Sequence, residues 1–136
     1  YSQGAMVVHR NLYALADNPQ LAAALLIADG DRLPVDTTVN LGSTAIAPSR
    51  GKGVAQEHSL LASANTAMLP PAVGARTVSI CDVGDPVCDY DDTATVSAAG
   101  IAIHTGYVPA AWSGTLYNLV ASAGAVQAAP LALTGG

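Results

Sequence analysis

Three residues of this chain could together perform acyl transfer, because they supply a hydroxyl nucleophile, a base and an acid. Ser2 lies in the segment Y-S-Q-G at residues 1–4. With a glycine just upstream this segment reads G-x-S-x-G, in which the serine occupies a sharp strand-to-helix turn that exposes its hydroxyl. Asp85 follows in the segment C-D-V-G-D-P-V-C, and His104 follows in I-H-T-G-Y. The order serine, aspartate, histidine is one of the chain orders in which catalytic triads occur.

The three segments together resemble the cutinase family of serine esterases. In that family a Y-S-Q-G turn precedes a C-x-x-G-D-x-V-C loop and an H-x-x-Y segment, which here lie at residues 1–4, 81–88 and 104–107. The resemblance covers most of the chain and implies an α/β fold, namely the three-layer α/β-hydrolase fold with a mostly parallel central sheet. It also implies that residues 1–136 are the C-terminal part of a single domain whose N-terminal half is missing from this chain.

This resemblance implies a two-step mechanism. His104 would take the proton of Ser2, Ser2 would attack the ester carbonyl, and Asp85 would orient the imidazole. The backbone N–H of Gln3, the residue after the nucleophile, would donate to the oxyanion. A second donor would come from the missing N-terminal half. The implied function is a secreted carboxylic-ester hydrolase that acts on lipid-like or polyester acyl esters and needs no cofactor.

Other functions are compatible with the same residues. A lipase, phospholipase, thioesterase or acyltransferase uses the same triad, and a non-catalytic secreted binding module could share the fold, since fold does not imply function. The expected partners are an ester or lipid substrate and the missing half of the domain. Three apolar residues near the triad either line an acyl pocket or pack in the core: Val87, Ile101 and Ile103.

Four other aspartates compete with Asp85 for the role of the acid: Asp82, Asp89, Asp91 and Asp92. The G-D-x-V-C pattern favours Asp85. We expect the run at residues 89–92 to form a charged, solvated turn and a helix N-cap, because short polar side chains are preferred there.

Two other histidines compete with His104. His9 lies two turns into a predicted helix and is expected on the helix surface, whereas His58 belongs to no matching motif. Three scattered histidines do not have the spacing of zinc ligands, so we expect no metal site.

The two cysteines, Cys81 and Cys88, are separated by six residues. A metal site would need further ligands close by, and a redox pair usually reads C-x-x-C. A disulfide that closes a small loop around Asp85 fits best, although two free thiols remain an alternative. Because disulfides persist in oxidising compartments, this pairing predicts a secreted, extracellular or cell-envelope-associated protein.

The composition is compatible with a single domain of 136 residues. Hydrophobic residues make up 51% of the chain, but only 4% is aromatic and Phe is absent, so small apolar residues must form much of the core. A net charge of -5 argues against nucleic-acid binding, which requires a basic patch. The longest apolar run, residues 21–28, is far shorter than the roughly 20 residues that span a bilayer, so we expect no transmembrane segment.

Helix-like and strand-like patterns alternate along the chain, as an α/β fold requires. Residues 3–16 have helical spacing and end before the D-N-P segment. Residues 21–28 form a buried parallel strand or, because they are rich in alanine, a helix. Residues 30–53 are expected to be surface loop, with one strand-like interlude at 38–41. The remaining predictions are a helix at 56–68, a strand at 75–81 that leads to Asp85, a later loop that carries His104, and a helix at 113–123.

Overall fold

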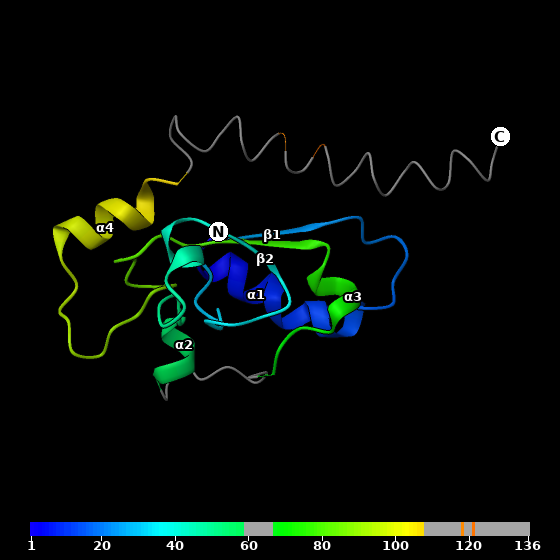
Figure 1. Cartoon of the computed structure of the whole chain (residues 1–136), viewed down its shortest axis with the longest axis horizontal. Helices are drawn as coiled ribbons and strands as arrows, with labels where there is room; N and C mark the ends of the chain where they lie inside the picture. The colour runs from blue at the N-terminus through cyan, green and yellow to red at the C-terminus, as the bar shows by residue number, and fades with distance from the viewer. Residues whose placement is uncertain (59–66, 108–117, 119–120, 122–136) are drawn as a thin grey trace.

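The structure is a computed structural model, and it describes residues 1–58, 67–107, 118 and 121. Helices and strands alternate along this part of the chain (Figure 1). In chain order they are α1 (Gln3–Leu12), η1 (Tyr13–Leu15), β1 (Ala24–Ile27), β2 (Val39–Leu41), η2 (Ser43–Ile46), α2 (Val54–Glu57), α3 (Pro71–Gly74), β3 (Thr77–Ile80) and α4 (Ala98–Thr105), where η1 and η2 are short 3₁₀ helices.

The three strands form one parallel sheet in the order β1-β3-β2. The register places Ile27 of β1 and Leu41 of β2 on either side of Ile80, so all three strands end at the same edge. This arrangement confirms the α/β class. Parallel neighbours need crossover connections, and the connection from β1 to β3 contains both β2 and α3.

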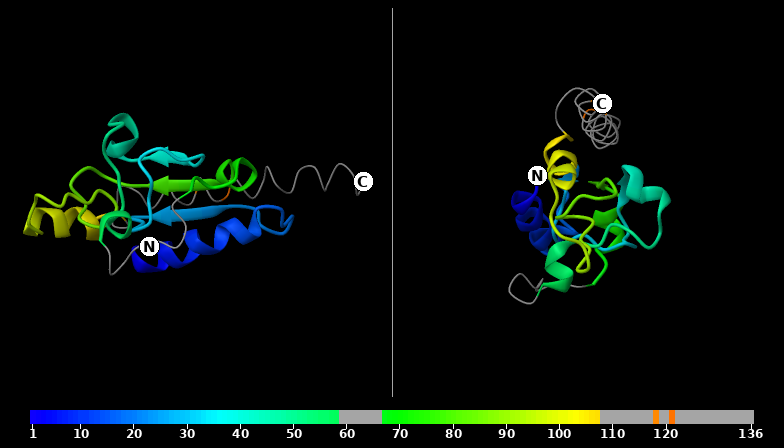
Figure 2. Two further views of the ribbon diagram at one scale, coloured as in Figure 1. Left: turned by 90° about the horizontal axis from the view of Figure 1, so that it is seen from below. Right: turned by 90° about the vertical axis from the view of Figure 1, so that its left-hand side faces the viewer.

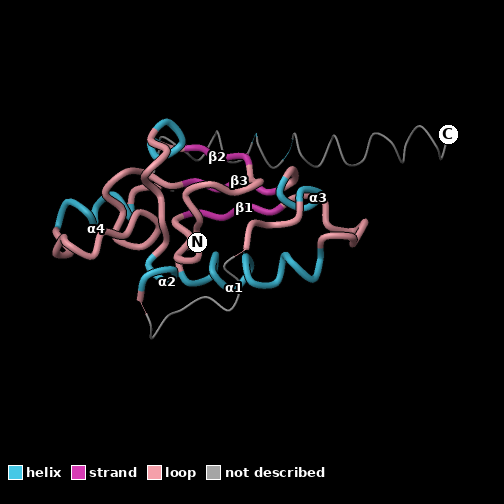
Figure 3. The backbone as a smooth tube through the Cα atoms, turned by 60° about the horizontal axis from the view of Figure 1, so that its bottom comes forward, coloured by secondary structure: helices cyan, strands magenta, loops and turns pink. Residues whose placement is uncertain are grey.

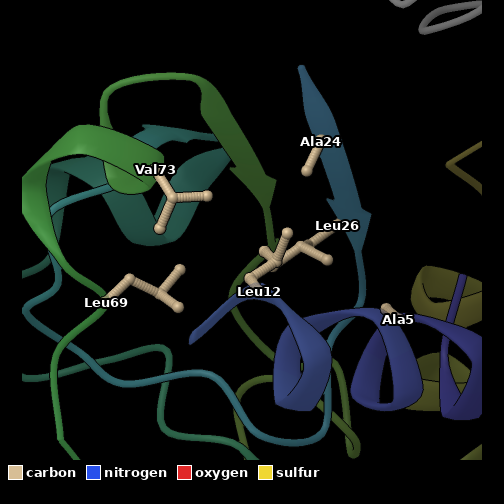
Figure 4. Close-up of a cluster of buried hydrophobic side chains, with 6 residues drawn as sticks. All are labelled: Ala5, Leu12, Ala24, Leu26, Leu69 and Val73. Atoms are coloured by element: carbon tan, nitrogen blue, oxygen red, sulfur yellow. The ribbon is translucent and has the colours of Figure 1, made fainter. Parts of the chain in front are cut away.

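One face of the sheet is covered by α1 and α3. Alternation along β1 points Ala24 and Leu26 to this face, where both are buried, while Leu25 points to the other face and is half-buried. Small and branched apolar side chains from the helices and from the segment before α3 fill the space above β1 (Figure 4). This cluster consists of Ala5, Leu12, Ala24, Leu26, Leu69 and Val73.

A second buried cluster lies where β1 and β3 end. It contains apolar residues from both strand ends, both cysteines and a tyrosine that follows α4: Ile27, Ala28, Ile80, Cys81, Cys88 and Tyr107. Figure 2 shows the strand arrows pointing toward the end of the molecule that carries α4, and in Figure 3 many loops gather at this end. In parallel sheets, ligands bind outside the carboxyl ends of the strands.

The predicted helix at 3–16 and the predicted strands at 21–28 and 75–81 are confirmed, as α1, β1 and β3. α1 buries Ala5, His9 and Leu12, which recur at helical spacing. The helix tightens into η1 before the D-N-P segment, where a proline cannot continue it.

The strand-like interlude predicted at 38–41 is confirmed as the edge strand β2. The prediction that the rest of residues 30–53 is surface loop is wrong in part, because residues 30–32 are buried and residues 43–46 form η2. Of the helix expected at 56–68, residues 59–66 lie outside the described residues. The described part contains α2, Val54–Glu57, which ends there because the backbone of His58 is extended, and residues 67 and 68 are not helical. The helix predicted at 113–123 falls almost wholly outside the described residues.

No helix among residues 1–58 and 67–107 is long and apolar enough to cross a membrane.

Gly42 lies between β2 and η2, against the start of the loop that carries Asp85, and its backbone has a φ of +92°. A Cβ at this position would lie 2.3 Å from the carbonyl oxygen of Cys81, with no flexible side chain to give way. We predict that Gly42→Ala lowers the free energy of unfolding by roughly 2–4 kcal/mol, measured by urea denaturation, because strain and overpacking add.

Gly4→Ala is the matched control. A Cβ on Gly4, within α1, would meet no atom within 4 Å. Alanine also has the higher helix propensity, so this variant should be as stable as the parent or more stable by up to about 1 kcal/mol. Equal destabilisation by the two substitutions would contradict the close approach at Gly42.

Candidate active site

Ser2 lies on a strained turn at the start of α1. Its φ of 53° and ψ of -124° fall outside the regions that residues with a side chain usually occupy. The backbone N–H of Ser2 donates to the carbonyl oxygen of Ile27 at 2.9 Å, which fixes this turn to the carboxyl end of β1. Such strain persists only where the surrounding structure holds it, and it often occurs at functional positions.

His104 lies 3.0 Å from Ser2, measured from Nε2 to the serine Oγ. On its other side, Nδ1 lies 3.0 Å from each carboxylate oxygen of Asp85. Because the ionised carboxylate can only accept, the neutral imidazole carries its proton on Nδ1 and leaves Nε2 as the acceptor for the serine hydroxyl. The structure therefore brings together the three residues that the sequence selected, in the order nucleophile, base and acid.

The location of His104 differs from the prediction, because it lies in the last turn of α4 rather than on a loop. The side chain of Ser97 accepts from the N–H of Gly100 at 3.0 Å and caps the start of this helix. Gly100 is buried against the carbonyl of Gly84. Glycine is unfavourable inside a helix, but at this position the absence of a side chain lets α4 pack closely on the acid loop.

Asp85 is fully buried, and its carboxylate is satisfied from several directions. Oδ1 accepts from the N–H of Val87 at 2.7 Å and of Cys88 at 3.2 Å. Oδ2 accepts from the hydroxyl of Tyr107 at 2.8 Å. A buried carboxylate without such donors would be costly, so these bonds hold Asp85 in the orientation that His104 meets.

The disulfide between Cys81 and Cys88 is confirmed, and it closes a ring that contains Asp85. Both cysteines are fully buried. Cys81 directly follows β3, so the ring is attached to the end of a central strand. The competing aspartate in this ring, Asp82, instead accepts from the backbone N–H of Ser43 at 2.9 Å and joins the ring to the loop after β2.

Two further groups of the Y-S-Q-G segment face the site. The hydroxyl of Tyr1 donates to the carbonyl oxygen of His104 at 2.7 Å, and the two rings lie 5.1 Å apart. Burial and the nearby charge of Asp85 raise the pKa of Tyr1. The N–H of Gln3, in the first turn of α1, has no hydrogen-bond partner among the described residues, so it is available as a donor at the positive end of the helix dipole.

Asp89 is not the solvated turn residue that the sequence predicted. It is 5% exposed, and its carboxylate accepts from Arg50 and from the N–H groups of Gly51 and Gly84. Burial alone would raise the pKa of Asp89, but these bonds outweigh it and lower the pKa. Asp89 thereby fixes the loop next to Asp85. The prediction failed because a single sequence does not place Arg50 beside this run.

His9 is buried rather than on the helix surface. Its Nδ1 lies 2.5 Å from Oδ2 of Asp29, a residue that follows β1, and its ring stacks on Tyr13. Burial alone would lower the pKa of His9, but the hydrogen bond and charge of Asp29, with the charges of Asp36 and Asp31, raise it overall. His9 therefore ties α1, the helix that begins at Ser2, to the end of β1.

Two cavities among the described residues lie beside the acid loop, and no residue of the candidate triad lines either of them. One of about 220 Å³ is lined by the loop around Gly84 and Asp89 and by the start of α4, and neither Ser2 nor His104 contributes to it. The apolar residues near the triad lie outside both buried clusters, because Ile101 is 52% exposed and Val87 and Ile103 are half-buried.

No three His, Cys, Asp or Glu side chains within the described ranges are placed to hold a metal ion. No protein-family model, curated protein or solved structure matches this chain.

The disulfide ring allows a first test of this site. We predict that Cys81→Ala/Cys88→Ala lowers the free energy of unfolding by about 2–3 kcal/mol, because the reduced chain regains the entropy of a small open loop. Urea denaturation with and without a reductant measures this. The reductant should destabilise the parent protein and leave the double variant unchanged, and a double variant as stable as the parent would contradict the prediction.

The pair of His9 and Asp29 predicts a pH-dependent stability. Because the pKa of His9 is raised in the folded protein, its contribution is fully present below the unfolded pKa of about 6.5 and is lost as the pH rises through the folded pKa. His9→Gln should therefore lose more stability, relative to the parent, at roughly pH 6 than at roughly pH 9. His58→Gln, at an exposed histidine, is the control. A loss for His9→Gln that does not change with pH would contradict this assignment.

Proposed function

We propose that this chain carries the catalytic triad of a secreted serine esterase of the cutinase type, which hydrolyses acyl esters. One observation carries the proposal: the 3.0 Å contact from Ser2 Oγ to His104 Nε2, continued from His104 Nδ1 to Asp85. The nucleophile and base of acyl-transfer enzymes lie within this distance, and a third group orients the base.

The proposed reaction begins with proton transfer from Ser2 to Nε2 of His104 as the serine oxygen attacks the ester carbonyl. The tetrahedral intermediate collapses, His104 returns the proton to the leaving alcohol, and an acyl-enzyme remains on Ser2. Water then attacks the acyl group with His104 again as base. Asp85 stays ionised throughout and stabilises the imidazolium. The fixed Nδ1 tautomer supports this role, since the wrong tautomer would present a proton to the serine.

The N–H of Gln3 is the proposed oxyanion donor. It lies directly after Ser2 in the first turn of α1, where backbone N–H groups and the helix dipole favour negative charge. In studied enzymes, losing one such donor raises the barrier by roughly 3–4 kcal/mol.

The same proposal extends to the fold. A parallel sheet and a serine held on a strained turn at the strand ends support a three-layer α/β-hydrolase fold. The other face of β1, which carries half-buried Leu25, would then be covered by further elements of the domain.

The disulfide supports a secreted or cell-envelope location, because such bonds are rare in reducing compartments. The exposed apolar side chain of Ile101, one turn before His104 on α4, favours a lipid-like or polyester acyl group over a charged substrate. A lipase, phospholipase, thioesterase or acyltransferase would use the same three residues and differ in the acyl acceptor or the leaving group.

A non-catalytic binding module is the alternative from another class. Such a module would not need the tautomer of His104 to be fixed, or a strained serine within hydrogen-bond distance of it. Strain of this kind costs about 1–3 kcal/mol, which a binding surface elsewhere on the fold would have no reason to keep.

A fluorophosphonate probe tests the proposal on the naturally produced protein. We predict a single covalent adduct by intact mass, absent in Ser2→Ala, together with hydrolysis of short acyl esters. Asp85→Asn should react about 10,000-fold more slowly, because it disturbs the imidazole tautomer.

The matched control is Ser49→Ala, at an exposed serine for which no hydrogen bond is found among the described residues. This variant should label like the parent. A folded, full-length protein that forms no Ser2-dependent adduct would sink the esterase proposal and favour the binding module.

A further inference from the structure

Tyr107 makes three contacts at the back of the candidate triad. Its hydroxyl lies 2.8 Å from Oδ2 of Asp85, 2.9 Å from the N–H of Asp82 and 3.5 Å from Sγ of Cys88. A phenol has one proton to donate. The N–H of Asp82 is itself a donor, and the sulfur is part of a disulfide and carries no proton. The single O–H of Tyr107 is therefore directed to the carboxylate.

Burial keeps this hydroxyl protonated. Tyr107 is 1% exposed and Asp85 is fully buried. Burial raises the pKa of Tyr107 strongly and the charge of Asp85 adds to the effect, while the N–H of Asp82 acts in the opposite direction. The phenol thus remains a neutral donor across the pH range in which a histidine titrates.

The two carboxylate oxygens of Asp85 are held differently. Oδ1 is fixed by backbone N–H groups of its own loop, at Val87 and Cys88. Among the described residues, Oδ2 meets only Tyr107 and His104. Without the tyrosine, nothing else in the described part of the chain would hold Oδ2 when the imidazole moves.

His104 and Tyr107 are three residues apart, and both bond the same carboxylate. The end of α4 is therefore attached to the acid loop at two points. A one-residue slip of this segment would break both bonds, so the tyrosine also fixes where the imidazole lies relative to Ser2.

We propose that Tyr107 is a positioning residue for the candidate triad: it orients Asp85 and disperses part of its negative charge, and it thereby sets the pH at which His104 becomes the free base. This inference rests on the proposed function for its catalytic meaning, but the contact itself does not depend on activity.

Within residues 1–58 and 67–107, few ionisable groups face the imidazole of His104 from the elements packed against it. They are Asp85 from the acid loop and Tyr1 from the turn before α1, with Tyr107 and Asp82 behind the carboxylate. Ser2 faces it as a neutral hydroxyl. Removal of the phenol O–H leaves the charge of Asp85 undispersed, which favours the imidazolium.

The primary test is NMR titration of the histidine ring signals in the parent protein and in Tyr107→Phe. We expect the midpoint of His104 to move to higher pH by at least about 0.5 unit, since a hydrogen bond to a charged group is stronger than one between neutral groups. The signals of His9 and His58 serve as internal references and should not move. Where esterase activity is present, the acidic limb of kcat/KM should shift by the same amount, and kcat should fall with little change in KM.

Tyr90→Phe is the control variant. It removes the same atom from a half-buried tyrosine whose hydroxyl has no hydrogen bond among the described residues. Its titration and pH profile should match the parent. If Tyr107→Phe does not fold, site-specific replacement of Tyr107 by a ring-fluorinated tyrosine takes its place. The more acidic phenol donates more strongly and should move the His104 midpoint to lower pH.

The outcomes separate this inference from the proposed function. A shifted His104 midpoint in a protein without esterase activity would retain the positioning role and reject the esterase. An active protein whose His104 midpoint does not move in Tyr107→Phe would overturn the positioning role. A loss of stability or kcat with an unchanged midpoint would likewise leave Tyr107 as a packing residue only and overturn the inference.

Discussion

The buried carboxylate of Asp85 is the constraint on which much of the structure depends. A charge without solvent contact is tolerated only when donors surround it, and here they come from its own loop, from Tyr107 and from His104. Satisfying this one group requires the loop to close on itself, which the disulfide enforces. It also requires the end of α4 to lie against the loop. The position of His104 follows from that requirement rather than from any property of the helix alone.

A second set of constraints holds the serine. Ser2 and Ala28 both have positive φ, and they lie on either side of the hydrogen bond from Ser2 to Ile27. Conformations of this kind are unfavourable for residues with a side chain, so other contacts must stabilise them. Contacts from α1 supply this stabilisation: His9 binds Asp29 and Arg10 binds Asp31, and both acids lie in the segment after β1. Strain and compensating ion pairs therefore occupy the same few residues.

The candidate site thus combines three segments that are far apart in the sequence, all at the carboxyl edge of a parallel sheet. The turn at Ser2 is held by β1, the acid loop by β3, and α4 by the acid loop. Asp89 adds a further attachment by joining the acid loop to Arg50. A few buried polar groups specify which segments pack against one another. Small apolar residues therefore suffice for the core, because the two apolar clusters need only to bury surface and do not have to select the packing partners by the shape of their side chains.

The alternation of helix and strand, the pairing of the two cysteines and the selection of Ser2, Asp85 and His104 could be predicted from the amino-acid sequence, because these depend on local period and on short motifs. The burial of His9 and Asp89 could not be predicted in this way, since each is compensated by a partner, Asp29 or Arg50, that a single sequence does not place beside it. The same holds for Tyr107: its motif marked the residue, but its role depends on a carboxylate 22 positions earlier. Long-range charge compensation is a property of the folded chain, and local patterns do not encode it.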